Sequence, residues 1–320
     1  MKTMPNKSSN NKTLINTILA GLLLFIATCI WGYAFVMQKQ GMEVIGAFWL
    51  TAWRFLLGGV VLIPFVLFES RQTKYCYKDI VYIVKSSLLL GFLLTGGSNF
   101  QQIALSFTSV ASSGFITSMY VVIIPIIAFL IWGVKVSLLT WIGISLTVLG
   151  LFLISITSDF TINYGDLLTL ICAVFWALHV IFVGFCVKKI SPFLLASAQF
   201  LVCSGLSFGL AFLFDRNSFE LSMLWQVKHE LLYLGILAVG VGYTVQIIGQ
   251  KFISAVPAAI ILSLEAVTAS IAGWYFLGEI FTLRNWIGCS LMLLGCLIAQ
   301  LAPFIRRKKS INPTVKQLPQ

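Results

Sequence analysis

Residues Pro257–Glu279 read PAAIILSLEAVTASIAGWYFLGE. The stretch is apolar over about 20 residues, which is the length of an α-helix that crosses the hydrocarbon core of a bilayer. One carboxylate, Glu265, lies in the first half of the stretch. An ionised group near the middle of a membrane costs on the order of 2.5–3.5 kcal/mol on insertion scales. A carboxylate at such a position predicts a functional site that faces the interior of a helix bundle.

The whole chain has the composition of a membrane protein. Of its 320 residues, 59% are hydrophobic and 10% are charged, whereas soluble domains carry about 25% charged residues. The net charge of +11 is typical of basic cytoplasmic loops and favours no nucleic-acid partner. None of the seven cysteines has a C-x-x-C spacing, so we interpret them as buried apolar residues. We expect a polytopic membrane protein with no metal and no cofactor.

Ten apolar segments follow one another along the chain. They are 14–37, 47–68, 86–105, 110–132, 137–157, 166–187, 193–214, 231–250, 257–277 and 285–304. The first is longer than the core of a signal peptide, about 7–15 residues, so we interpret it as an uncleaved span. With the N-terminus inside, sixteen Lys and Arg residues fall in inside segments and four in outside segments. Basic loops stay in the cytoplasm, so this distribution predicts that both termini are cytoplasmic.

The chain repeats itself at an offset of about 145 residues. Trp141–Gly150 reads WIGISLTVLG and Trp286–Gly295 reads WIGCSLMLLG, with seven of ten positions identical. Further matching pairs are Ile30-Trp31 with Phe175-Trp176, Arg54-Phe55 with Gln199-Phe200, and Gln102 with Gln246. Each half has five spans, and this odd number makes the second half enter the membrane from the opposite side. Such inverted repeats place the substrate site near the midplane between the halves and work by alternating access.

These patterns define the expected fold and its boundaries. We expect an all-α polytopic membrane protein in which ten transmembrane helices form two inverted five-helix repeats around a central cavity. The first repeat is predicted at residues 1–157 and the second at residues 158–305. A basic cytoplasmic tail is predicted at residues 306–320.

Several short motifs together resemble the EamA-type branch of the drug/metabolite transporter superfamily. They are Trp31-Gly32-x-x-Phe35, Arg54-Phe55-Leu56, Gly165-Asp166-Leu167, Trp176-Ala177-Leu178-His179, Leu262-Ser263-Leu264-Glu265 and Leu277-Gly278-Glu279. The resemblance covers nearly the whole chain. It implies ten helices in two inverted halves around a cavity, and export of small metabolites or drugs across the inner membrane of a bacterium. Lys135 departs from the pattern, because many members have a glutamate there.

Two charged residues within predicted spans are the first candidates for a site. A low-dielectric environment favours the neutral form of a carboxyl group, so Glu265 is a candidate for substrate contact and for coupling to protons. The alternative is a static ion pair, with Arg54 as the partner. Arg54 could bind a carboxylate or phosphate through its planar guanidinium. It could also extend to the lipid headgroups with its stem buried.

Polar and aromatic residues in other spans are further candidates. Asn99 with Gln102, and Tyr243 with Gln246, are three residues apart and so share a helix face. We expect these four to line the cavity, although hydrogen bonds between helices are the alternative. The remaining candidates for cavity lining are Trp31, Trp176, His179, Tyr120 and Ser263. The alternatives are a lipid-facing position or core packing for the two tryptophans and an ordinary hydrogen bond for His179.

Three functions are compatible with these patterns to different degrees. A secondary active exporter of amino acids or related metabolites, with protons as the candidate coupling ion, fits the pattern best. An exchanger or importer of a nucleotide-like or other anionic metabolite is the alternative. An intramembrane serine protease built on Gly96-Gly97-Ser98 and His179 is a remote third, because the motif is weak. We therefore expect no enzyme, a small-molecule substrate, and a monomer or homodimer in the bilayer.

Overall fold

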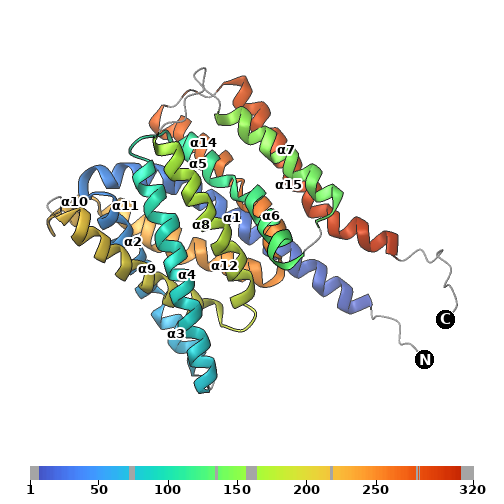
Figure 1. Ribbon diagram of the computed structural model, residues 1–320, viewed down its shortest axis with the longest axis horizontal. Helices are drawn as coiled ribbons and strands as arrows, with labels where there is room; N and C mark the ends of the chain where they lie inside the picture. Colours follow the sequence, from blue (N-terminus) through green and yellow to red (C-terminus); the bar gives the residue numbers. More distant parts are fainter. Residues whose placement is uncertain are drawn as a thin grey trace.

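The computed structural model describes residues 7–71, 76–133, 136–155, 164–216, 219–278, 280 and 282–310 (Figure 1). Lys135 and Glu279, both singled out from the sequence, lie outside these residues. The described part of the chain forms helices and contains no strand. Eight helices are long and apolar enough to cross a membrane, and two shorter apolar helices, Leu138–Gly150 and Trp286–Gly295, bring the number to the expected ten.

The first repeat contains seven helical segments. They are α1 (Lys7–Ile45), α2 (Ala47–Val61), α3 (Ile63–Ser70), α4 (Tyr77–Ala104), α5 (Val110–Ser118), α6 (Tyr120–Trp132) and α7 (Leu138–Ser155). Segments α2 and α3 together make one span, and so do α5 and α6. The span α4 begins at Tyr77, well before the predicted residue 86. Its N-terminal turn is polar, with Lys78 and Asp79 in it, so hydropathy did not mark it as helical.

The second repeat contains the remaining segments. They are α8 (Tyr164–Cys186), α9 (Pro192–Phe214), α10 (Met223–Gln226), α11 (Lys228–Leu232), the π-helix η2 (Tyr233–Tyr243), α12 (Thr244–Phe252), α13 (Ala255–Leu262), α14 (Glu265–Leu277) and α15 (Leu283–Ser310). Segments α11, η2 and α12 make one span, and so do α13 and α14. The short helix α10 lies in the long connection after α9.

The fourth span of each repeat ends in the same way. Gly133 follows α6 with φ 64°, and Gly278 follows α14 with φ 68°. Both glycines adopt the left-handed conformation that commonly terminates helices. They are 145 residues apart, so the offset seen in the sequence reappears in the backbone.

The same two spans are broken at equivalent positions near their middle. The chain makes tight turns at Met119 and at Leu264, where backbone N–H groups donate to the carbonyl three residues back, on Ile116 and Ile261. Short 3₁₀ turns of this kind inside a helix often mark a functional hinge. The sequence predicts one uninterrupted span at 257–277, and the break before Glu265 corrects that prediction.

Small residues bring the fifth spans of the two repeats together. A Cβ atom added at Gly150 would lie 2.4 Å from the Gly288 carbonyl oxygen, and one at Gly295 would lie 2.5 Å from the Gly143 carbonyl oxygen. These two contacts are equivalent under the repeat. Close backbone approach through small residues is the usual basis of helix association in membranes. Segments α7 and α15 therefore run side by side along one edge of the molecule (Figure 1).

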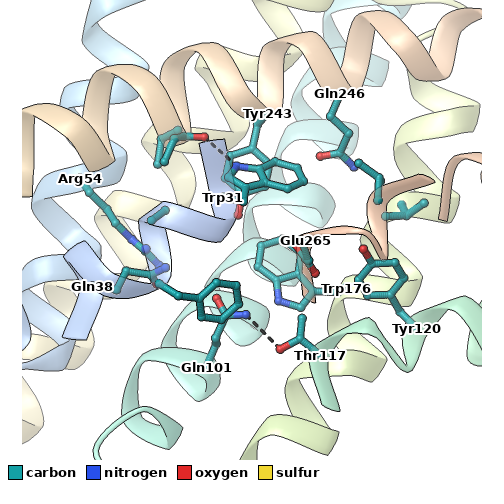
Figure 2. Close-up of a pocket in the computed structure, with 16 residues that line it drawn as sticks. Trp31, Gln38, Arg54, Gln101, Thr117, Tyr120, Trp176, Tyr243, Gln246 and Glu265 are labelled. Carbon is teal, nitrogen blue, oxygen red and sulfur yellow. Dashed lines mark hydrogen bonds between the residues drawn. The ribbon is translucent and has the colours of Figure 1, made fainter. Parts of the chain in front are cut away.

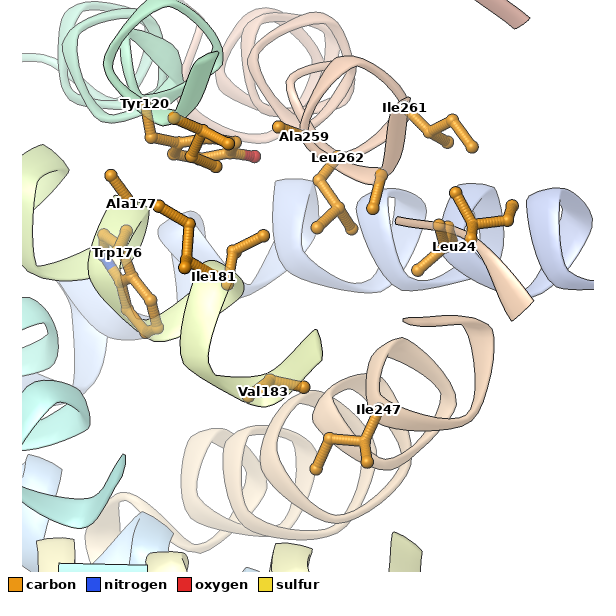
Figure 3. Packing of buried hydrophobic residues seen from close by; sticks show 14 of the residues in the cluster. Leu24, Tyr120, Trp176, Ala177, Ile181, Val183, Ile247, Ala259, Ile261 and Leu262 are labelled. Atoms are coloured by element: carbon orange, nitrogen blue, oxygen red, sulfur yellow. The ribbon is translucent and has the colours of Figure 1, made fainter. Parts of the chain in front are cut away.

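Two apolar clusters lie at the two ends of the bundle. We call the end with Lys78, Lys85, Lys188, Lys189 and Lys251 the basic end. Towards it, buried side chains from α1, α8, α12 and α13 pack together (Figure 3). Among them are Leu24, Val183, Ile247 and Ile261. This packing fills the bundle between the cavity and the basic end with apolar side chains.

At the opposite end, which holds residues 46, 106–109, 215–216 and 219–232, aromatic side chains pack together. The Trp49 ring stacks on Phe219 with centroids 4.2 Å apart, and its Nε1–H donates to the Asp215 carbonyl oxygen at 2.9 Å. The Phe48 backbone N–H donates to the Asp215 carboxylate at 3.2 Å. The connection after α9 is thereby held against the start of α2.

Candidate functional site

A cavity lies between the two apolar clusters, in the middle of the spans. Side chains from both repeats line it (Figure 2). They are Trp31, Ala34, Phe35, Gln38, Arg54, Gln101, Thr117, Tyr120, Trp176, Val180, Ala238, Val239, Tyr243, Gln246, Leu262 and Glu265. The volume open to the centres of water-sized spheres is about 40 Å³. That is room for a few water molecules, so a metabolite would enter only if side chains moved.

Glu265 is positioned by the break in its span. It is the first residue of α14, and its side chain is 6% exposed. The helix N-terminus carries a partial positive charge that stabilises an anion there. The Tyr120 hydroxyl is the polar neighbour of the Glu265 carboxyl group. Tyr120 begins α6 as Glu265 begins α14, so the two residues hold equivalent places in the two repeats.

Arg54 enters the cavity from α2. It is 5% exposed, its Nε–H has no hydrogen-bond partner, and no ion pair to an acidic side chain forms within the described part of the chain. The guanidinium carbon lies 5.3 Å from the centroid of the Phe55 ring. Extension of Arg54 to the lipid headgroups is therefore wrong. The static pair with Glu265 is not formed either, although both side chains line one cavity.

Three aromatic rings lie in a row along the cavity. They belong to Trp31, Tyr243 and Trp176, and we call them the aromatic wall. The Tyr243 ring lies between two indoles, 4.7 Å from the Trp31 ring and 5.7 Å from the Trp176 ring, which it stacks on at 15°. Tyr243 ends η2 and Gln246 follows one turn later on α12. Electron-rich ring faces of this kind attract cations, and they also pack well against apolar groups.

Four buried polar atoms without a hydrogen-bond partner belong to residues that line the cavity. Arg54 Nε and Trp176 Nε1 are buried donors without an acceptor, and Gln38 Oε1 and Gln246 Oε1 are buried acceptors without a donor. Buried polar groups normally have partners, so each exception calls for an explanation. A bound molecule with both acceptors and donors, or water in its place, would satisfy all four.

Four of the predicted residues do not line the cavity. Asn99 donates to the Ser207 hydroxyl at 2.9 Å, between α4 and α9. Gln102 donates to the Gln38 carbonyl oxygen at 3.1 Å and to Met42. His179 is hydrogen-bonded to Gln199 at 2.9 Å, and the Ser263 hydroxyl donates within its own helix to Ile260. These side chains instead join helices or satisfy backbone groups, which was the alternative stated for most of them.

Three polar residues that the sequence analysis did not predict also line the cavity: Gln38, Gln101 and Thr117. Gln101, rather than Gln102, lines the cavity and donates to the Thr117 hydroxyl at 3.1 Å. The offset of 145 residues pairs Gln101 with Gln246, so a strict use of that offset would have found it. Gln38 and Thr117 carried no comparable signal, because no polar repeat mate marks them.

The protease hypothesis fails on geometry. His179 Nε2 is bonded to Gln199, and the buried Ser98 hydroxyl has no hydrogen-bond partner. A serine nucleophile requires a base within hydrogen-bond reach. The two side chains therefore do not form a nucleophile–base pair.

The model of the EamA-like transporter family matches residues 18–156 and again residues 163–301. The chain belongs to the EamA-like transporter family. An uncharacterized transporter of Archaeoglobus fulgidus is 30% identical over 90% of this chain and 87% of its own. The uncharacterized transporter YdfC of Bacillus subtilis is 26% identical over 81% of this chain and 83% of its own.

A solved structure supports the same architecture. It superimposes on this EamA-like transporter with a TM-score of 0.70 at 20% sequence identity, and the match covers 91% of this chain and 98% of the other. At that level of identity the likeness shows the fold alone. The protein is thus a multi-pass membrane transporter of two EamA repeats.

Proposed function

We propose that this protein is a secondary active exporter of amino acids or closely related zwitterions. Arg54 binds the substrate carboxylate and Glu265 binds its amino group or a proton. The observation that carries the proposal is that a guanidinium and a carboxyl group line one cavity without pairing. Because an unpaired buried charge is costly, both groups are supplied with a partner when a zwitterion binds between them.

The rest of the cavity suits such a substrate. Trp31, Phe35 and Leu262 offer apolar surface for a side chain, while the amides of Gln38 and Gln246 offer acceptors. Small-molecule sites commonly combine an apolar wall with a few oriented polar groups. Glu265 then serves substrate and proton in turn, so that the proton gradient drives export.

The apolar packing at the two ends of the bundle supports alternating access. Opening the apolar cluster at the basic end would admit substrate from one side, and opening the cover formed by Trp49 and Phe219 would release it on the other. We place the protein in the bacterial inner membrane with both termini in the cytoplasm, which makes the basic end the cytoplasmic one. This orientation follows the distribution of Lys and Arg.

The alternative, transport of an anionic metabolite without an amino group, rests on Arg54 alone. It leaves Glu265 unexplained, since a second negative charge in the cavity would repel such a substrate. A panel of ligands separates the two functions.

The test is thermal unfolding of the purified protein in detergent with amino acids, nucleotides, organic acids and lipophilic cations. A ligand that binds only the folded state stabilises it by about 2.7 kcal/mol at 100 times its Kd. Stabilisation by amino acids, lost in Arg54→Gln and in Glu265→Gln, is the expected result. Stabilisation by nucleotides or organic acids alone would replace the proposal with its alternative.

A further inference from the structure

The two repeats differ by one residue inside η2, and glycine contacts show where. A Cβ atom added at Gly91 would lie 2.4 Å from Val202 Cγ1, and one at Gly235 would lie 2.6 Å from Leu57 Cδ2. Val202 and Leu57 are themselves repeat mates, so Gly91 and Gly235 hold equivalent places. Their offset is 144 residues, one less than the offset between most pairs.

The next pair of glycines restores the usual offset. A Cβ atom at Gly97 would lie 3.0 Å from the Trp176 ring, and one at Gly242 would lie 2.7 Å from Trp31 Nε1. Gly97 and Gly242 are 145 residues apart. The second repeat therefore has one residue more than the first between these two contacts. Its chain is a π-helix there, whereas the equivalent part of α4 is α-helical throughout. The wider π turns accommodate the extra residue.

This difference coincides with unequal environments of the two repeat-related indoles. Trp31 Nε1–H donates to the carbonyl oxygen of Ala238, within η2, at 3.0 Å. A second bond, from the Tyr233 hydroxyl to the Ile30 carbonyl oxygen at 2.9 Å, ties the same two helices together. Trp31 is thus fixed to η2 at one end of the aromatic wall.

Trp176 has no such attachment. It is 7% exposed, it lines the cavity, and its Nε1–H has no hydrogen-bond partner. The Cys172 thiol, four residues earlier on α8, interacts with the indole but is only a weak acceptor. Figure 2 shows the indole nitrogen of Trp176 on the side of Thr117 and Gln101, across the cavity from the bond that holds Trp31. A buried N–H without an acceptor favours any ligand that brings one.

We infer that, because of the extra residue in η2, the two repeat-related tryptophans have different roles. Trp31 is a positioning residue. Its hydrogen bond to the Ala238 carbonyl oxygen, which we call the latch, fixes the aromatic wall. Trp176 is the free indole, and it donates its N–H to an acceptor atom of the substrate. The donor role of Trp176 rests on the proposed function, whereas the latch on Trp31 does not.

The latch is tested without any substrate, by exchange of the indole hydrogens. The protein is labelled with ¹⁵N-tryptophan, and the variants Trp31→Phe and Trp176→Phe assign the two signals. The Trp31 N–H is expected to exchange with D₂O at least tenfold more slowly than the Trp176 N–H, because Trp31 donates to a backbone carbonyl oxygen whereas Trp176 has only a thiol, a weak acceptor, beside it. Equal exchange of the two indoles would overturn the division of roles.

The donor role is tested by L-leucine flux in liposomes with the same pair of variants. Each variant keeps an aromatic ring and loses one N–H. Trp176→Phe is expected to raise KM about tenfold with an unchanged maximal rate. Trp31→Phe is expected to keep KM within twofold and to lower the maximal rate. An unchanged KM in Trp176→Phe would show that only water meets this N–H and would overturn the donor role.

The exchange experiment and the flux experiment can each give a negative result without affecting the other. A wild-type protein that carries no L-leucine and is stabilised by no amino acid counts against the proposed function, and the exchange rates still decide the latch. Circular dichroism and gel filtration of both variants establish that each is folded before either measurement is interpreted.

Discussion

The Ser118 hydroxyl donates a hydrogen bond of 3.3 Å to the carbonyl oxygen of Ser263. The two serines are 145 residues apart and each lies at the break in the fourth span of its repeat. The breaks of the two repeats thus meet each other directly. The next equivalent pair, Tyr120 and Glu265, begins the second halves of the same spans, where both residues line the cavity.

This contact between the two breaks explains why only one repeat supplies a carboxyl group. Two carboxyl groups at equivalent places would face each other across the contact, and like charges in a low-dielectric site cannot both stay ionised. The first repeat carries a phenol there instead, and its hydroxyl can donate to Glu265. The site is symmetric in backbone and asymmetric in charge.

Glu265→Gln should abolish transport driven by a pH gradient while the protein still inserts and folds. The amide keeps the shape of the side chain but neither binds nor releases a proton at neutral pH. Flux of L-leucine into liposomes with an imposed pH gradient measures the effect. Tyr120→Phe is the matched control, because it removes the neighbouring hydroxyl and keeps the carboxyl group. Proton-driven flux that persists unchanged in Glu265→Gln would eliminate the coupling role.

Arg54→Gln should make the protein more stable and weaken its binding of substrate. It gives the first repeat the residue that the second repeat already has at Gln199. Removal of a buried charge without an acidic partner is expected to raise the free energy of unfolding by about 1–4 kcal/mol. Affinity for carboxylate-bearing substrates should fall at least tenfold, because hydrogen bonds to charged groups contribute about 1.5–3 kcal/mol.

Thermal unfolding with and without amino acids measures both effects of Arg54→Gln. Arg54→Lys is the control, since it keeps the charge and loses the planar fork. A variant that is less stable than the wild type and binds normally would show that Arg54 is a structural residue.

Gly150→Ala should destabilise the protein by about 1–3 kcal/mol, the usual cost of overpacking. The new methyl group would lie 2.4 Å from the Gly288 carbonyl oxygen, and a backbone atom cannot move aside cheaply. Gly205→Ala on α9 is the control, because a Cβ atom there meets nothing within 4 Å. The control should be neutral or slightly stabilising, since glycine is a poor helix former. Equal unfolding temperatures for both variants would contradict the close packing of α7 on α15.

Much of the fold could be predicted from the sequence, because apolar runs of about 20 residues and basic loops are strong signals. The breaks at Met119 and Leu264 could not. Neither position carries a proline or glycine, so the helices bend there through contacts that lie far apart in the chain, such as the bond from Ser118 to Ser263. The π-helix η2 was not predicted either, because its glycines alone do not tell a π-helix from an α-helix, although the change of offset between Gly235 and Gly242 marks the extra residue.

The site was predicted less completely than the fold. Glu265, Arg54, Tyr243 and the two repeat-related tryptophans were found because charges and large rings stand out in apolar spans. Adjacent residues on a helix point about 100° apart, so an error of one residue replaced Gln101 with Gln102. Spacing alone could not decide whether Asn99 and His179 faced the cavity or a neighbouring helix.

Phe219→Ala should open the end of the bundle opposite the basic end. The ring of Phe219 stacks on Trp49 at 4.2 Å, and its loss removes an aromatic contact that holds the connection after α9 against α2 at this end. A cysteine introduced by Gln38→Cys, on the cavity wall, should then react with a membrane-impermeant thiol reagent several-fold faster. Phe193→Ala is the matched control, because its ring stacks on Phe65 at 5.3 Å near the basic end. Faster labelling with the control than with Phe219→Ala would place the entrance to the cavity at the basic end and contradict the aromatic cover.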